Sequence, residues 1–341
     1  MFYTTLLRPL LFRLDPESAH RLTFNVLERA RQWHLLRPAV IPCQPRCVMG
    51  IDFPNPVGLA AGLDKNGEYL DALAALGFGF IEIGTVTPRP QPGNPPPRMF
   101  RIPQASAVIN RLGFNNLGVD KLIENINRAD YQGILGINIG KNFDTPLEKA
   151  VDDYRLGLQK VYRYASYVTV NISSPNTLHL RQLQSTEALD DLLNQLKTEQ
   201  EKLAQIHGKY VPMVIKIAPD LDAEQIESIA TLLLAHQIDG VIATNTTTAR
   251  PGIEHLPAAQ ENGGLSGAPL THRATVVIQQ LHDLLQDRIP IIGVGGIMSA
   301  RNAEEKFTAG ARLIQLYTGL IYRGPDLVKE AAQAVCKSRI G

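Results

Sequence analysis

Eight short apolar segments, each ending in polar or glycine-rich residues, constrain the fold of this chain more than any other feature. They occupy residues 56–60, 80–84, 134–137, 167–172, 213–215, 241–243, 291–294 and 313–316. An amphipathic segment with helical periodicity follows each of them, at residues 69–76, 117–127, 147–164, 186–206, 223–236, 270–285, 300–309 and 325–336. This alternation predicts an α/β fold, a (β/α)8 TIM barrel. A doubly wound sheet shares the alternation, but the glycine-rich dinucleotide turn expected after its first strand is missing.

The fourth apolar segment ends in a loop that suggests catalysis. Residues 167–172 run into Ser173, Ser174 and Pro175, followed by Asn176 and Thr177. Ser-Pro-Asn is typical of a turn, so a reactive loop at a rigid strand end is predicted. Ser174 lacks the flanking glycines of a hydrolase nucleophile, so we expect it to accept a proton in a closed site, with Thr177 as a relay.

The other strand ends favour a flat cofactor. They carry hydrogen-bonding side chains and one cation: Thr85, Asn138, Asn171, Lys216 and Thr244. This mixture suits the edge of a heteroaromatic ring, and a lysine beside a flavin can stabilise its anionic reduced form. Taken singly, each threonine or asparagine is equally well explained as a satisfied buried polar residue.

Glycines after the last two strands predict a phosphate site. Residues 293–296 and 317–319 bring backbone N–H groups to the place where such barrels usually bind phosphate. Residues 136–142 resemble a nucleotide-triphosphate loop, but the glycine spacing is too short and Asn142 stands where serine or threonine is needed. We therefore expect a phosphorylated ligand that is not a nucleoside triphosphate.

Two loops between the apolar segments have marked compositions. The proline density of residues 88–98 forbids a helix and predicts a stiff path across the barrel mouth, with a polyproline docking ligand as the alternative. Residues 110–116 carry three carboxamides, an arginine and an aromatic side chain, which suit recognition of planar amides and carboxylates. A helix N-cap is the alternative role for Asn115 or Asn116.

Several classes of function find no support. The eight histidines include no pair at ligand spacing, and none ends a strand, so no metal site is expected. A formal net charge of +1 provides no basic field for nucleic acid. Cys43, Cys47 and Cys336 show neither a paired framework nor ligand spacing with histidine, and a reducing compartment is expected.

The first forty residues lie outside the repeat. We expect residues 1–40 to form an amphipathic helical segment, with a break at residues 15–17, and residues 41–341 to form the barrel. Arginines flank both apolar stripes, so the segment either lies on a membrane or caps the barrel floor, and the pattern alone favours the cap. Residues 38–45 are predicted as a linker, and residues 48–55 as a hairpin before the first barrel strand.

Five motifs together resemble dihydroorotate dehydrogenase of class 2, the quinone-linked, membrane-associated type. They lie at residues 61–65, 83–88, 110–115, 171–177 and 263–267. The resemblance covers essentially the whole chain, including the N-terminal helical segment. It implies oxidation of (S)-dihydroorotate to orotate through bound FMN, with a quinone as the final acceptor, in pyrimidine (UMP) biosynthesis.

The resemblance also assigns residues. It implies that Ser174 removes the C5 proton while the C6 hydride passes to the flavin, with Phe114 and Thr177 bordering the proton route. Substrate contacts are implied for Lys65, Asn110, Arg111, Leu112, Gly113, Phe114, Asn171, Asn176, Asn245 and Thr246. FMN contacts are implied for Ala61, Gly62, Leu63, Asp64, Lys65, Thr85, Asn138, Asn171, Lys216, Thr244, Gly267, Gly296, Tyr317 and Thr318.

With the resemblance, the N-terminal segment is better interpreted as a membrane-facing entrance for the quinone than as an inert cap. The residues implied for the entrance are Leu6, Leu10, Phe24 and Leu27, with Arg8, Arg13 and Arg21 near lipid headgroups. The sequence has neither a transit peptide nor a transmembrane helix, so we expect peripheral association with the cytoplasmic side of a bacterial inner membrane.

Two rival functions stay open on the sequence alone. Lys216 at a strand end also suits a Schiff base in an aldolase-type barrel with a phosphosugar substrate. A membrane-bound barrel that senses a pyrimidine without turnover is the second rival. An NAD-linked dihydroorotate enzyme is disfavoured, because the N-terminal segment would be unnecessary and the motif after the fourth strand would carry cysteine.

Overall fold

Eight parallel strands close into a barrel in the computed structural model, which describes residues 3–36, 39–177 and 179–337. Chain order and spatial order coincide, and β13 pairs with β3 to close the ring. The strands are β3 (Val57–Leu59), β4 (Phe80–Val86), β7 (Ile134–Ile139), β8 (Tyr167–Asn171), β9 (Met213–Ile217), β10 (Gly240–Ala243), β12 (Ile291–Val294) and β13 (Ala311–Leu316). All eight predicted strands are confirmed, and so is the (β/α)8 barrel.

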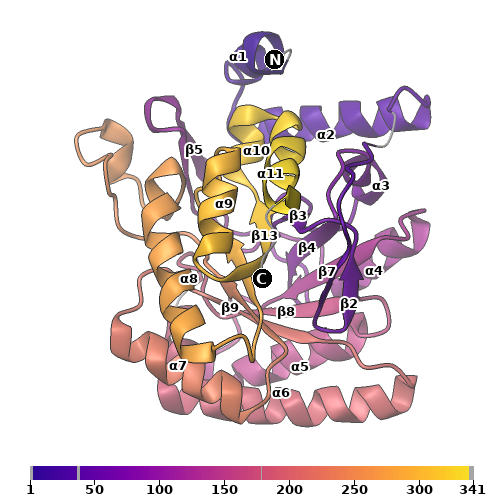
Figure 1. Ribbon diagram of the computed structural model, residues 1–341, viewed down its shortest axis with the longest axis vertical. Helices are drawn as coiled ribbons and strands as arrows, with labels where there is room; N and C mark the ends of the chain where they lie inside the picture. Colours follow the sequence, from indigo (N-terminus) through magenta and orange to yellow (C-terminus); the bar gives the residue numbers. More distant parts are fainter. Residues whose placement is uncertain (1–2, 37–38, 178, 338–341) are drawn as a thin grey trace.

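Helices cover the outside of the barrel (Figure 1). They are α3 (Leu70–Ala74), α4 (Val119–Arg128), α5 (Ala150–Val161), α6 (Thr186–His207), α7 (Ala223–Ala235), α8 (Thr271–Leu285), α9 (Ala300–Thr308), α10 (Thr318–Arg323) and α11 (Asp326–Lys337). Short 3-10 turns are η2 (Pro103–Ala105), η3 (Leu147–Lys149), η4 (Leu180–Gln184), η5 (Pro257–Gln260) and η6 (Ala268–Leu270). The predicted helices are confirmed, although α3 is shorter than the expected 69–76.

Side chains along β4 alternate between the two faces of the barrel wall. Ile81 and Ile83 pack outward into the main hydrophobic core, whereas Phe80 packs with Tyr167 inside the barrel. A Cβ on Gly58 would lie 2.3 Å from the Phe80 ring, so glycine is required where this ring fills the interior. The interior is therefore a packed floor, and ligands are confined to the barrel mouth.

A hairpin and an N-terminal pair of helices extend the barrel. The predicted hairpin is confirmed as β1 (Arg46–Val48) and β2 (Ile51–Phe53). The predicted N-terminal helices are confirmed as a π-helical turn, η1 (Tyr3–Leu7), continued by α1 (Arg8–Leu11), and as α2 (Pro16–Gln32). Asp15 separates them, because its side chain caps α2 by accepting from the Ser18 backbone N–H at 2.9 Å.

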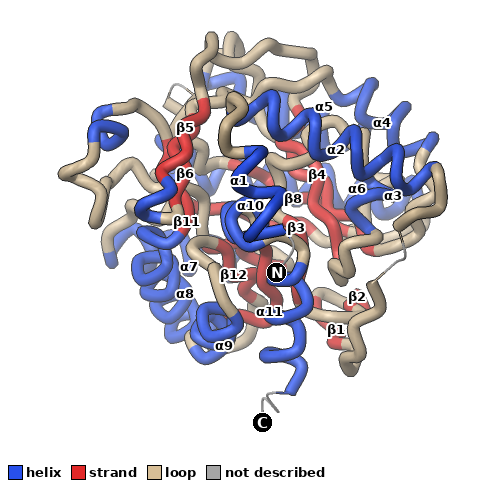
Figure 2. The backbone as a smooth tube through the Cα atoms, turned by 90° about the horizontal axis from the view of Figure 1, so that it is seen from above, coloured by secondary structure: helices blue, strands red, loops and turns tan. Residues whose placement is uncertain are grey.

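A three-stranded antiparallel sheet at the barrel mouth was not predicted. It consists of β5 (Met99–Ile102), β6 (Ala107–Asn110) and β11 (Gly264–Gly267), which run side by side in Figure 2. Arg101 on β5 donates to the Leu11 carbonyl at 3.0 Å, and Arg98 pairs with Glu17 at 2.8 Å. This sheet therefore supports the N-terminal helices.

The cysteines correct one expectation from the sequence. Cys43 and Cys336 form a disulfide, so the expectation of no pairing was wrong. They are 293 residues apart in the chain, and only the fold brings the segment after α2 against α11. Cys47 is free and exposed. Of the predicted linker at 38–45, residues 39–45 contain no helix or strand, and Pro38 lies outside the described residues.

Candidate active site

The carboxyl ends of the barrel strands surround one cavity. It brings together most of the predicted site residues, from every barrel strand end except that of β7 and from the loops above them. They are Ala61, Gly62, Lys65, Thr85, Asn110, Leu112, Gly113, Phe114, Asn171, Ser174, Asn176, Lys216, Thr244, Asn245, Thr246, Gly267, Gly296, Tyr317 and Thr318. The parallel sheet explains this clustering, because all eight strands end at the same rim.

A buried carboxylate below the cavity orients the first polar side chains. Glu82 accepts from Asn138 Nδ2 at 2.8 Å, so the amide oxygen of Asn138 faces Thr85, whose hydroxyl donates to it at 2.6 Å. Thr85 in turn accepts from Asn171 Nδ2 at 2.9 Å. Because each donor direction follows from the preceding one, Glu82 fixes which way the Asn171 amide points.

Two lysines bring positive charge to the cavity. Burial lowers the pKa of Lys216, which lies at the end of β9, and the nearby Glu82 carboxylate opposes this shift. Burial also lowers the pKa of Lys65 to about 8, with Glu17 raising it and Arg98 lowering it further. With a pKa of about 8, Lys65 is mostly charged at neutral pH, and in a poorly hydrated site its ammonium group attracts an anionic ligand strongly.

The loop after β8 holds Ser174 at the cavity. Ser174 is 5% exposed, and its Oγ accepts from the Asn176 backbone N–H at 3.2 Å. Asn176 Nδ2 donates to Asn110 Oδ1 at 3.2 Å. Among the described residues the buried Oγ1 of Thr177 has no hydrogen-bond partner, and it lines a second cavity beneath the proline-rich loop. The Thr177 hydroxyl is thus able to pair with a group that enters this second cavity.

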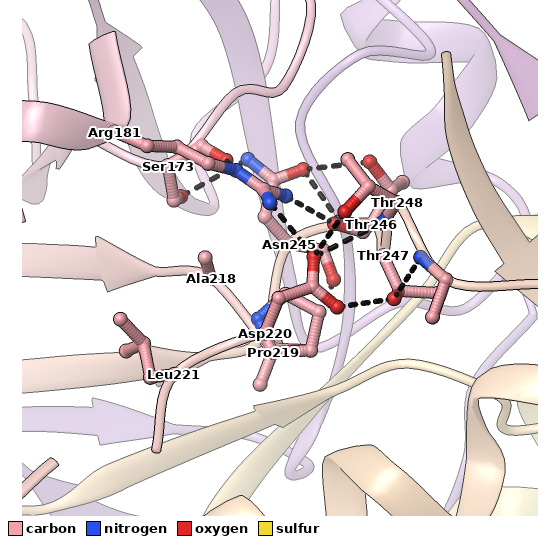
Figure 3. A network of polar contacts seen from close by, with 12 residues as sticks. Ser173, Arg181, Ala218, Pro219, Asp220, Leu221, Asn245, Thr246, Thr247 and Thr248 are labelled. Atoms are coloured by element: carbon pink, nitrogen blue, oxygen red, sulfur yellow. Dashed lines mark hydrogen bonds and ion pairs between the residues drawn. The ribbon is translucent and has the colours of Figure 1, made fainter. Parts of the chain in front are cut away.

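Carboxamides of the β8 and β10 loops contact one another. Asn245 Nδ2 donates to Asn171 Oδ1 at 3.2 Å and to Ser173 Oγ at 3.0 Å. Its own oxygen accepts from the Thr246 backbone N–H at 2.8 Å. The bond between Asn245 and Ser173 joins the two loops (Figure 3), and Asn171, Ser174 and Asn245 line the same cavity.

Two glycines with positive φ line another part of the cavity. Gly296 has φ +71°, and a Cβ there would lie 2.3 Å from Thr271 Oγ1. Gly267 has φ +97°, and a Cβ there would lie 2.3 Å from the Ser106 carbonyl oxygen. Only glycine fits both positions, which leaves bare backbone against the cavity. Such a cradle suits a phosphate, as the sequence predicted.

Five of the predicted site residues do not line this cavity. Leu63 packs in the core, and Asn138 lies behind Thr85. Asp64 accepts from the backbone N–H groups of Glu68 and Tyr69, and burial raises its pKa to about 6 against these hydrogen bonds. Arg111 pairs with Glu261 at 2.6 Å, and both Arg111 and Thr177 line the second cavity. These residues support the cavity from outside.

Some lining residues were not predicted as site residues. They include Ser266, Leu270, Ile297 and Gln315. Ser266 precedes the predicted Gly267, and Gln315 lies two residues before the predicted Tyr317. The alternation of β13 points Gln315 into the barrel, a signal that the sequence contains. Leu270 and Ile297 are apolar and belong to no motif. Among the residues with described coordinates, no cluster of three histidine, cysteine or acidic side chains suits a metal ion.

Comparisons with known proteins agree with this geometry. The family model for dihydroorotate dehydrogenase matches residues 46–338. The chain is 64% identical over 341 residues to dihydroorotate dehydrogenase (quinone) of Nitrosospira multiformis, covering 100% of this chain and 98% of the relative. It is 59% identical over 335 residues to the protein of the same name in Acinetobacter baumannii, covering 98% and 100%. The crystal structure of Eimeria tenella DHODH in complex with ferulenol superposes with a TM-score of 0.86 at 36% identity, covering 94% and 90%.

Proposed function

The chain belongs to the quinone-dependent dihydroorotate dehydrogenases, and we propose that it oxidises (S)-dihydroorotate through bound FMN, with Ser174 as the base. The product, orotate, places the reaction in pyrimidine biosynthesis. Relatives named as quinone-linked enzymes over nearly the full length disfavour both an aldolase and a non-catalytic sensor. The observation that carries the catalytic proposal is the buried Ser174 hydroxyl at a cavity that also holds Lys216.

The residues that line the cavity suit both the phosphate and the ring of FMN. The glycine cradle at Gly267 and Gly296 suits the phosphate, because bare backbone with no room for a Cβ faces the cavity there. Thr85, Asn171 and Lys216 suit the polar edge of the ring. Bound FMN supplies a hydride acceptor. Lys216 places a cation where negative charge develops, and Glu82 below it keeps the local charge balanced.

The remaining side chains suit the substrate. Lys65 offers an ammonium group to the carboxylate of dihydroorotate, and the amides of Asn110, Asn176 and Asn245 match the ring, which bears alternating N–H and C=O groups. Several fixed donors and acceptors would orient the ring and hold the C5 proton toward Ser174. Orientation of this kind contributes as much to the rate as the base itself.

Ser174 is a weak base in water and depends on its surroundings. Its burial excludes water that would compete for the substrate proton. The partnerless hydroxyl of Thr177 lies three residues further along the same loop and can pass the proton outward. We assign the proton from C5 to Ser174 Oγ, whose own hydroxyl proton leaves toward Thr177 in the same step, so that Ser174 stays neutral.

Replacement of Ser174 tests this assignment. Ser174→Ala should keep its flavin and bind orotate, while anaerobic flavin reduction slows by about two to four orders of magnitude, as for the loss of a general base. Ser173→Ala is the matched control, since Ser173 is also buried but does not line the cavity, and it should lose about tenfold or less. Loss of flavin from Ser174→Ala, or equal rates in the two variants, would show that Ser174 is structural.

We also propose that residues 1–40 lie on the cytoplasmic face of the inner membrane and admit the quinone, while residues 41–341 bind FMN and substrate. Part of α2 is buried, with Phe24 at 5% exposure, which fixes the helix to the barrel. Other apolar residues of this segment face outward: Leu6, Leu10, Leu22, Val26 and Trp33 are 47–70% exposed. An inert cap would bury such residues, whereas a membrane surface accepts them. No helix among the described residues is both long and apolar enough to cross a bilayer.

A further inference from the structure

One arginine outside the cavity connects three loops of the barrel mouth. Arg181 Nε donates to the Ser173 carbonyl oxygen at 3.1 Å, on the loop after β8. One terminal nitrogen donates to the Thr246 carbonyl oxygen at 2.8 Å, on the loop after β10. The other donates to Asp220 Oδ2 at 2.7 Å, on the loop after β9. Figure 3 shows the guanidinium between these three groups.

We propose that Arg181 is a positioning residue that holds the base Ser174 at a fixed distance from the substrate-binding amide of Asn245. The inference rests on the proposed function. Arg181 binds the carbonyl oxygens of Ser173 and Thr246, which are the immediate neighbours in the chain of Ser174 and Asn245. A guanidinium is planar and rigid, so binding both carbonyl oxygens fixes their separation. A lysine, with a single ammonium nitrogen at the end of a flexible chain, holds the two oxygens less rigidly.

A side-chain hydrogen bond also links the loops after β8 and β10, which Arg181 links through their backbone carbonyls. Asn245 Nδ2 donates to Ser173 Oγ at 3.0 Å, on the face of the loops toward the cavity. The same amide also donates to Asn171 Oδ1 at 3.2 Å. Without Arg181, these two contacts of the Asn245 amide would have to hold the loops after β8 and β10 together. Deeper in the barrel, Tyr154 OH donates to the Asn171 carbonyl oxygen at 2.7 Å, which anchors only the end of β8.

Asp220 orients the guanidinium. It also accepts from the Thr248 backbone N–H at 2.9 Å and from the Thr247 hydroxyl. Burial alone would raise the pKa of Asp220, but hydrogen bonds from Thr247, Thr248 and Arg181 outweigh burial, so the pKa is lowered. The carboxylate therefore stays charged and holds Arg181 in the orientation that reaches both carbonyls.

The position of Arg181 determines whether its replacement affects the catalytic geometry or the stability of the fold. The side chains of Arg181 and Asp220 are 24% and 23% exposed, so water can reach part of the groups that lose a partner when Arg181 is replaced. Flavin content therefore has to be measured beside the rates, because it shows whether the fold is retained. Arg181 does not line the cavity, so its loss removes no substrate contact. The effect of its replacement should fall on the geometry of proton transfer.

The chain offers a matched control for the test. Arg89 pairs with Asp144 at 2.6 Å across two other loops of the barrel mouth, with side chains 58% and 50% exposed. Its guanidinium donates only to that carboxylate among the contacts of the described residues, and to no carbonyl beside Ser174 or Asn245. Arg89→Gln therefore breaks a more exposed ion pair of the barrel mouth without loosening the catalytic loops.

The experiment measures the two half-reactions of the holoenzyme separately by stopped flow. In Arg181→Gln, anaerobic flavin reduction by saturating dihydroorotate should slow about 100-fold, the scale of a 1 Å misplacement, and the isotope effect from deuterium at C5 should rise. Flavin content and reoxidation by a soluble quinone should match the parent protein. Arg181→Lys should be slowed at least about tenfold, and Arg89→Gln should reduce at the parent rate.

Several results would overturn the inference. Parent-like reduction in Arg181→Gln would do so, as would equal loss of both half-reactions or loss of flavin, since these indicate a structural role. Parent-like reduction in Arg181→Lys would show that charge alone suffices. Ser174→Ala measured in parallel separates the two proposals. If it slows reduction while Arg181→Gln does not, only the positioning role fails. If Ser174→Ala reduces normally, the base assignment fails and the positioning role with it.

Discussion

The carboxylate of Glu82 provides a quantitative test of how the interior supports the site. It is fully buried, and it accepts from Asn138 Nδ2, Tyr167 OH, Thr169 Oγ1 and Gln315 Nε2 at 2.7–3.2 Å. Glu82→Gln keeps the shape but removes the charge. Either orientation of the new amide turns an N–H₂ group toward at least one of these donors.

The expected cost follows from those contacts. Each remaining hydrogen bond weakens by about 1 kcal/mol when its acceptor loses its charge, and a buried donor without an acceptor costs about 1–3 kcal/mol. Glutamine is neutral, so the free energy that the native protein spends on burying the carboxylate charge is no longer needed, and this offsets part of the cost. We expect Glu82→Gln to lower the free energy of unfolding by about 3–5 kcal/mol, the usual range for breaking a buried charged group. It should also lower the pKa of Lys216 further, because the opposing carboxylate charge is gone.

Chemical denaturation followed by far-ultraviolet circular dichroism measures this cost. Fluorescence is less suitable, because Trp33 lies at the end of α2, is 70% exposed, and does not report on the barrel. Glu199→Gln is the control: Glu199 is 8% exposed but accepts one hydrogen bond, from Gln159 at 2.7 Å. It should lose about 1 kcal/mol or less. Equal losses in the two variants would refute the role given to Glu82.

Two further predictions concern other regions. Burial lowers the pKa of Lys306 to about 7 from 10.5; between these values the unfolded chain binds more protons, so stability rises with pH. Relative to Lys306→Met, the parent should gain up to about 1.4 kcal/mol per pH unit from pH 7 to 9, and a constant difference in denaturation midpoints would contradict this. Leu10, on α1, is 53% exposed, so Leu10→Glu should weaken sedimentation with anionic lipid vesicles but leave anaerobic flavin reduction unchanged. Leu156→Glu is the control, because Leu156 lies on α5 and is 40% exposed. Equal vesicle binding by the two variants would count against a membrane-facing N-terminal segment.

The barrel and most of its site were predictable from the sequence. Parallel strands buried on both faces produce apolar runs, and their shared rim makes polar strand ends functional candidates. That reasoning led to Thr85, Asn171, Ser174 and Lys216, all of which line the cavity. Periodicity and position sufficed, because each signal lies within a few residues of the strand that produces it.

What the sequence did not reveal depends on distant contacts. In the sheet of β5, β6 and β11, residues 107–110 pair with residues 99–102 on one side and with the distant residues 264–267 on the other. These segments look like loops when taken alone. The Cys43–Cys336 disulfide spans 293 residues. Arg181 reaches loops that follow three different strands, so its role appears only when the barrel brings them together. For the role of Glu82, the only local sign in the sequence was its charge within the apolar run 80–84.

The most direct test of the proposed function is an anaerobic absorbance spectrum of the purified protein, recorded before and after addition of dihydroorotate and then of a soluble quinone. We predict a flavin spectrum that bleaches with dihydroorotate and returns with the quinone. A colourless protein, or a flavin that dihydroorotate does not bleach, would contradict the proposed cofactor and chemistry.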